Sequence, residues 1–111
     1  MILTALALLS TTCGIDRVTP VRGGVAISFT YSGEADIRRD GQNRRVRIGR
    51  RPVRLHADEE LMIRGVHDFC SLTIRTRDGV LGVEAYSWLS DPTSEHPASE
   101  ETSFVPAQRP R

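Results

Sequence analysis

Residues 70–88 read CSLTIRTRDGVLGVEAYSW, and this stretch decides the fold. Asp78-Gly79 favours a two-residue type I′ hairpin turn, because both central positions of that turn need a positive φ. Folding the chain about this turn places Ile74 opposite Val83. The apolar side chains of both arms then share one face of the hairpin: Leu72, Ile74, Leu81, Val83 and Ala85. The stretch therefore predicts an antiparallel hairpin with one buried face.

Upstream of this hairpin, apolar and polar residues alternate at 25–31 and again at 35–38, and turn residues follow at 40–43. Apolar positions then switch from even numbers (Val46, Ile48) to odd numbers (Val53, Leu55) across residues 49–52. We interpret this switch as a hairpin turn, and we expect a further short strand at 61–64. About seven or eight short strands predict an all-β fold, a small antiparallel β-sandwich or barrel.

The length of 111 residues suits one domain, and composition divides the chain into three parts. We expect an apolar N-terminal strand or arm at 1–17 and a β-domain at 18–89. Residues 90–111 hold four of the six prolines together with acidic, Ser and Thr residues. Such a segment buries too little apolar surface to offset its ordering entropy. We therefore expect an extended C-terminal tail that is disordered or bound to a partner.

The first nine residues are apolar but too few to span a bilayer as a helix. Residues 9–13, LSTTC, resemble the lipobox of bacterial lipoproteins, which implies a cleaved leader and a lipid anchor at Cys13. Against a leader, no Lys or Arg precedes the apolar run, and Thr12 stands where a smaller residue is usual. We expect an N-terminal strand or arm, with the leader as the alternative.

The two cysteines, Cys13 and Cys70, are too far apart in sequence for a zinc motif. They are either a disulfide that closes a long loop or two separate, small, buried side chains. The second interpretation is the one we expect.

All 15 basic residues are arginine, and the net charge is +1. Eight arginines gather between residues 38 and 54, with Asp40 as the only acid among them. A hairpin at 44–57 would put three of them on its outward face and two at its tip, as a concentrated positive surface. These five are the candidate partner-binding residues: Arg45, Arg47, Arg54, Arg50 and Arg51.

Three aromatic residues complete the candidate partner-binding set. Tyr86 and Trp88 would share the outward face at the end of the last strand, as an interface anchor or as a lid over one end of the core. Phe104 would serve as an apolar anchor in the acidic tail. The arginine segment itself contains no aromatic residue for base stacking, so nucleic acid is a less expected partner than a protein or another copy of the chain.

No catalytic, phosphate-binding or dinucleotide motif occurs, and we expect neither an enzyme nor a cofactor. The residues His67-Asp68-Phe69-Cys70 alternate between two strand faces, so they do not predict a metal site. The expected function is a non-enzymatic structural or binding module in a larger assembly, such as an accessory or connector protein of a bacteriophage particle, which places it in a virion. The alternative is an exported surface lipoprotein with a β-sandwich binding domain.

Overall fold

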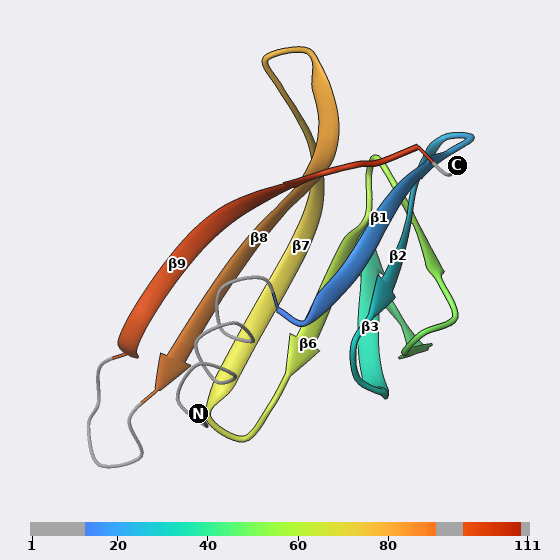
Figure 1. Ribbon diagram of the computed structural model, residues 1–111. Helices are drawn as coiled ribbons and strands as arrows, with labels where there is room; N and C mark the ends of the chain where they lie inside the picture. Colours follow the sequence, from blue (N-terminus) through green and yellow to red (C-terminus); the bar gives the residue numbers. More distant parts are fainter. Residues whose placement is uncertain (1–12, 91–96, 110–111) are drawn as a thin grey trace.

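The computed structural model describes residues 13–90 and 97–109, and within these residues the chain forms nine strands and no helix. The strands are β1 (Ile15–Val21), β2 (Gly24–Phe29), β3 (Gly33–Arg39), β4 (Gln42–Ile48), β5 (Val53–His56), β6 (Glu60–Arg64), β7 (Asp68–Arg77), β8 (Val80–Ser90) and β9 (Pro97–Pro106). They make a three-stranded sheet, β1-β2-β5, and a six-stranded sheet, β4-β3-β6-β7-β8-β9, in a sandwich-like arrangement (Figure 1). All strand pairs are antiparallel, and the all-β prediction is confirmed.

The hairpin of β7 and β8 has the register that the sequence predicts. Ile74 lies opposite Val83, and Asp78 and Gly79 form the turn with φ values of 53° and 79°. The face with the predicted apolar residues is turned toward the core, where Leu72 and Val83 are fully buried.

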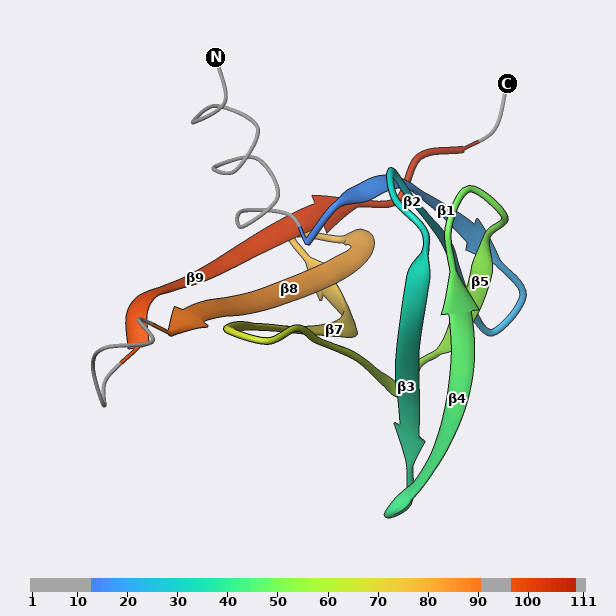
Figure 2. The same cartoon turned by 90° about the horizontal axis from the view of Figure 1, so that it is seen from below.

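The turn predicted at 49–52 is wrong, because β4 and β5 belong to different sheets. The chain folds back at Asp40-Gly41 instead, so β4 pairs with β3 and β5 pairs with β2. One long hairpin therefore bends from one sheet into the other, and Figure 2 shows β4 and β5 following each other around this corner. The register shifts by one residue across the corner, from Gly33 opposite Ile48 to Ile27 opposite Val53. That extra residue explains the switch of apolar parity that we interpreted as a turn.

The core lies between the two sheets and draws on both. Its largest fully buried side chains are Val18, Val25, Ile27 and Phe29 from β1 and β2, Leu55 from β5, and Ile37, Ile48, Leu61, Leu72 and Val83 from the six-stranded sheet. Each such side chain stabilises the fold by about 1.5–3 kcal/mol relative to exposure. The corner is also hydrogen-bonded, since the Phe29 N–H donates to the Gly49 carbonyl at 2.7 Å.

The expectation of a disordered or partner-bound tail at 90–111 is wrong for residues 97–106. These residues form β9, which pairs with β8 from Gly82 opposite Pro106 to Ser90 opposite Pro97. Beyond β9, the Gln108 N–H donates to the Val18 carbonyl at 2.7 Å and so reaches β1 of the other sheet. The folded domain therefore extends past the predicted boundary at residue 90.

Cys13 and Cys70 form a disulfide, with their Cα atoms 6.1 Å apart. The expectation of two separate buried thiols is therefore wrong. The bond joins Cys13, two residues before β1, to β7 in the six-stranded sheet. Of the predicted N-terminal arm, residues 1–12 and the lipobox residues before Cys13 lie outside the described residues, and β1 begins at Ile15.

Replacing Asp78-Gly79 by Ala-Ala should lower the free energy of unfolding by about 1–3 kcal/mol, because two alanines would then occupy left-handed backbone positions. The midpoint of urea denaturation measures the loss. Gly49→Ala is the matched control, since its φ is not left-handed and an added Cβ would lie 3.4 Å from Ser32 Oγ. Equal midpoints for the Ala-Ala variant and the native chain would contradict the role of this turn.

Reduction of the Cys13–Cys70 bond should lower the melting temperature, because the bond closes a loop with a sequence separation of 57 residues. The chain-entropy model gives a loss of about 3–4 kcal/mol for such a loop. Thermal unfolding with dithiothreitol tests this, and EDTA should leave the melting temperature unchanged. The double variant Cys13→Ala/Cys70→Ala should melt like the reduced chain and ignore dithiothreitol. A native chain that also ignores dithiothreitol would refute the stabilising role.

Candidate functional site

Ion pairs cross the outer face of the six-stranded sheet and engage part of the arginine cluster. Arg45 on β4 contacts two acids on β3, with Nη1 2.9 Å from Glu34 Oε1 and Nε 3.1 Å from Asp36 Oδ1. Hydrogen bonds to Asp36 and Glu34, and the charges of both acids, raise the pKa of Arg45 further above its ordinary value. Arg45 is therefore neutralised within the sheet, and its predicted role as a free partner-binding cation is not supported by this arrangement.

Two further arginines of the cluster are paired with acids in the β5–β6 connection and at the start of β6. Arg38 Nη2 lies 3.1 Å from Glu60 Oε1, and Arg39 Nε lies 2.8 Å from Asp58 Oδ2. Both pairs are exposed, and such pairs contribute only about 0–1 kcal/mol each. Their main effect is on the surface potential, because they cancel charge that the sequence alone presents as a positive block.

The fourth paired arginine belongs to a buried carboxylate site. The Glu59 side chain is 4% exposed and lies between Arg44, whose Nη2 is 3.5 Å from Oε2, and the turn that begins at His56. Glu59 Oε1 accepts from the His56 backbone N–H at 2.9 Å and lies 3.0 Å from His56 Nδ1. Burial acts to raise the pKa of Glu59, but the hydrogen bonds and charge of His56 and the charge of Arg44 outweigh it and hold the pKa below its ordinary value.

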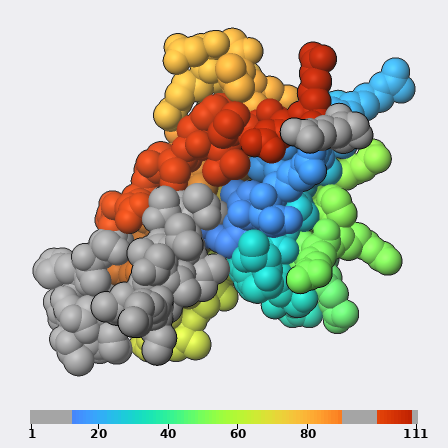
Figure 3. Space-filling view, viewed as in Figure 1, coloured from blue at the N-terminus to red at the C-terminus, as the bar shows by residue number. Residues whose placement is uncertain are grey.

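The remaining four arginines of the cluster form what we call the arginine corner: Arg47, Arg50, Arg51 and Arg54. All four are exposed, and among the described residues none has an ion-pair partner. They follow the bend of the chain from the end of β4 into β5. Figure 3 shows this green segment on the opposite side of the molecule from the red β9. The arginine corner is thus the part of the predicted positive surface that stays uncompensated.

A row of side chains crosses the outer face of β6, β7 and β8 at one end of the sheet. Arg64 lies opposite Phe69, and Phe69 lies opposite Trp88. The two rings stack with centroids 6.0 Å apart, and the Arg64 guanidinium lies 5.4 Å from the Phe69 centroid. The predicted shared face of Trp88 and Tyr86 is found, but Trp88 is half-buried against Phe69. The stacking contact with Phe69 covers part of the Trp88 ring, and the Arg64 guanidinium covers Phe69 in turn.

Tyr86 and Phe104 are also held by the sheet. Burial and the charge and hydrogen bond of Glu100 raise the pKa of Tyr86 above its ordinary value. Phe104 lies on β9 opposite Glu84, with the Arg77 guanidinium 5.1 Å from its ring centroid. Its ring also covers Gly82, where an added Cβ would come within 2.5 Å of Phe104 Cζ. Phe104 therefore packs on its own sheet and is not the anchor of an extended tail.

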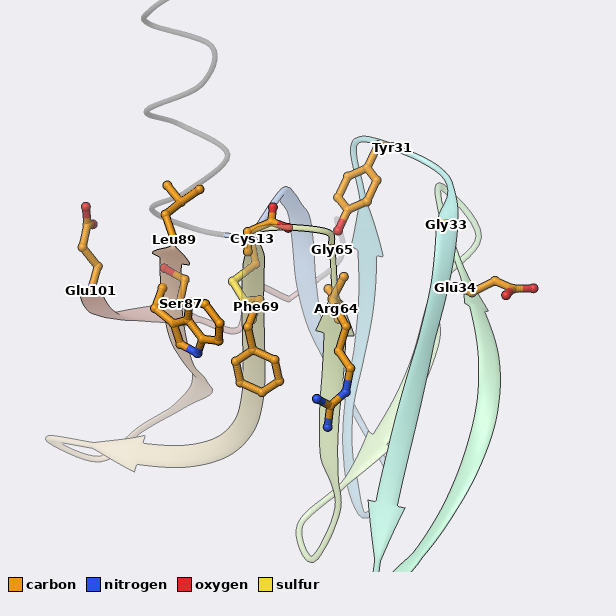
Figure 4. A pocket seen from close by; sticks show the side chains of 14 residues that line it. Cys13, Tyr31, Gly33, Glu34, Arg64, Gly65, Phe69, Ser87, Leu89 and Glu101 are labelled. Carbon is orange, nitrogen blue, oxygen red and sulfur yellow. A yellow bond between two sulfur atoms is a disulfide. The ribbon is translucent and has the colours of Figure 1, made fainter. Parts of the chain in front are cut away.

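A hollow of about 640 Å³ opens where β6, β7 and β8 meet the start of β3 (Figure 4). The disulfide forms part of its wall, together with Tyr31, Ile63 and Leu89. Burial, with a smaller contribution from the charge of Asp68, raises the pKa of Tyr31. The lining is largely apolar.

No three His, Cys, Asp or Glu side chains of the described chain come together as a metal site. A search of its helices for a segment able to cross a membrane found none in residues 13–90 and 97–109. No protein-family model, curated protein or solved structure matches this chain.

Sequence reasoning missed the ion pairs of β3 and β4, although a signal for them was present. Folding about Asp40-Gly41 brings Asp36 opposite Arg45 and places Glu34 diagonally from Arg45, within reach of the same guanidinium. An Asp-Gly dipeptide also correctly located the β7–β8 turn, at Asp78-Gly79. No sequence motif indicated the buried Glu59 site. That site depends on the tertiary contact between Arg44 on β4 and the turn between β5 and β6.

Glu59→Gln should destabilise the fold by about 1–3 kcal/mol, since it removes the negative charge and one of the two buried acceptor oxygens that His56 and Arg44 contact. Because the folded pKa of Glu59 is depressed, its contribution is present above the unfolded value of 4.5 and is lost as the pH falls through the folded value. The stability gap between native and variant chains should therefore narrow in acid, which urea denaturation across pH measures.

Asp58→Asn is the matched control for this experiment. Asp58 precedes Glu59 and pairs with Arg39, but its side chain is 53% exposed. Its substitution should change stability little. The depressed pKa of Glu59 would be contradicted if the difference in unfolding free energy between the native and Glu59→Gln chains stayed constant with pH.

Proposed function

We propose that this domain is a non-enzymatic structural or binding module that acts as a subunit of a larger protein assembly. Within this class, the role that fits best is that of an accessory or connector protein in a bacteriophage particle. That narrower assignment rests on analogy, because small lysine-free β-domains suit such roles. The physical argument concerns charge and exposure.

The uncompensated arginine corner is the observation that carries the proposal. Neighbouring like charges repel one another, so four exposed arginines without acidic partners do little to stabilise an isolated domain. They become favourable when an acidic surface approaches, because matched potentials accelerate association and exclude wrong partners. The paired arginines on β3 and β4 make the contrast clear, since the described acids near the cluster form ion pairs with them and not with the corner.

A protein partner is favoured over nucleic acid. Base stacking needs aromatic rings beside the cations, and residues 44–54 contain none. The aromatic row of Phe69 and Trp88 lies on β7 and β8, and its rings are engaged with each other and with Arg64. Phosphate contact alone would give binding without sequence or structure preference.

The two cysteines and the buried carboxylate of Glu59 have structural roles, which supports a non-enzymatic module. Both cysteines are in the disulfide. The buried carboxylate of Glu59 is engaged by His56 and Arg44. Neither group is left to act on a substrate.

The disulfide also bears on the alternative of a lipoprotein anchored at Cys13. Disulfides are typical of exported proteins and of cell or virion surfaces, which suits both proposals. A lipoprotein anchor, however, is a thioether on the cysteine sulfur, and Cys13 Sγ is already bonded to Cys70. The disulfide and the anchor are mutually exclusive on one chain, so the disulfide favours the assembly subunit.

Charge reversal in the arginine corner tests this function. Tagged full-length chain, captured from its own source at low salt, should bring down a partner protein or further copies of itself in a fixed ratio. Arg50→Glu/Arg51→Glu should reduce this recovery at least tenfold and leave the melting temperature unchanged, because both residues lie outside the strands. Quantitative mass spectrometry of the captured material gives the ratio.

The matched control is Arg22→Glu/Arg109→Glu, which makes the same change in net charge away from the corner. It should retain the partner. The proposal fails if the native chain brings down nothing in a fixed ratio, or if both double variants lose the partner equally.

A further inference from the structure

The six-stranded sheet ends in two strands that are each paired on one side only. Within the described residues, β4 pairs only with β3, and β9 pairs only with β8. The outer edge of such a strand presents backbone N–H and C=O groups that another strand can pair with. Figure 2 shows the two strands at opposite sides of the molecule.

We propose that copies of this chain associate head to tail, with the outer edge of β9 in one copy pairing with the outer edge of β4 in the next. This inference rests on the proposed assembly function and names the partner as a second copy. The sheet would then continue from one molecule to the next.

Strand direction permits this arrangement. Every neighbouring pair in the sheet is antiparallel, so in a sheet of six strands the first and last strands, β4 and β9, run in opposite directions. A second copy, rotated so that it continues the twist of the sheet, therefore brings its β4 antiparallel to β9. Antiparallel pairing is the slightly more stable form. A repeated contact between unlike edges generates a ring or a filament.

Charge selects unlike edges over like edges. β4 carries Arg44, Arg45 and Arg47 and no acid, whereas β9 carries Glu100 and Glu101 and no base. Pairing two β4 edges or two β9 edges would bring like charges together, and like charges directly opposite each other are destabilising. The β9–β4 pairing brings opposite charges together, so the same residues favour one contact and oppose two others.

The register follows from the rows of side chains on the outer face. Trp88 lies opposite Glu100 at one end of the sheet, and Glu34 lies opposite Arg47 at the other. Placing Glu100 opposite Arg47 of the next copy continues the alternation of charge across the junction. Arg47 is also the one arginine of β4 that lacks an ion pair within the described residues. The same register puts Thr102 opposite Arg45.

A charge swap tests the pairing in the purified full-length chain. A single strand pair makes a small interface, so association should be weak and sensitive to salt. Sedimentation velocity at low salt should show species larger than the monomer that grow with concentration. Arg47→Glu and Glu100→Arg should each shift the chain to monomer, and the double variant Arg47→Glu/Glu100→Arg should restore association.

Single cysteines test the register and separate this inference from the function on which it rests. An oxidised mixture of Thr102→Cys and Arg45→Cys chains should cross-link as a mixed dimer, whereas a mixture of Arg22→Cys and Arg45→Cys chains should not. Cross-linking of Thr102→Cys with itself would show a two-fold β9 contact and overturn the head-to-tail model. A chain that stays monomeric when pure but brings down another protein through the arginine corner would overturn this inference and leave the assembly function intact.

Discussion

The bend of the long hairpin at residues 30–32 and 49–52 is the constraint on which the rest of the domain depends. At this point the two arms of the hairpin leave the six-stranded sheet together and enter the three-stranded sheet. Because both chains turn at once, the buried faces of the two sheets are brought toward each other, and Phe29 and Ile48 lie on either side of the bend within one core. The hydrogen bond from the Phe29 N–H to the Gly49 carbonyl keeps the two arms paired through the bend. The positions of the buried Glu59 and of the arginine corner both follow from this bend.

The arginines of residues 38–54 fall into two groups, one with and one without ion pairs to described acids, and composition alone does not separate these groups. Arg38, Arg39, Arg44 and Arg45 meet acids contributed by β3, β6 and the connection after β5. Arg47, Arg50, Arg51 and Arg54 form no ion pair with a described acid, although Glu34 lies opposite Arg47 on β3. A nearly neutral protein therefore presents one positive side and, along β9, one acidic edge. Net charge averages these features to +1 and hides both.

Sequence reasoning succeeded where local chemistry determines the geometry. Asp78-Gly79 fixed the turn, the alternation of apolar residues fixed the buried face, and the register of β7 with β8 followed from the two together. It failed at residues 49–52, where a one-residue offset between paired strands imitates the parity change of a turn. It failed again at 97–106, because the acidic, proline-bounded composition of β9 is that of an exposed edge strand as well as that of a disordered tail. The disulfide depended on a distance between Cys13 and Cys70 that only the fold establishes.

The disulfide has a mechanical consequence. Cys13 lies two residues before β1, which is an edge strand of the smaller sheet. The disulfide connects Cys13 directly to β7, which pairs with a neighbouring strand on each side. A force applied to the chain on the N-terminal side of Cys13 passes through this covalent bond into β7, and the ladder of β1 with β2 lies off the load path. Under tension β7 is held on both sides, by its ladders with β6 and β8. With the bond reduced, the same force would reach β1 first and peel it from its margin one hydrogen bond at a time.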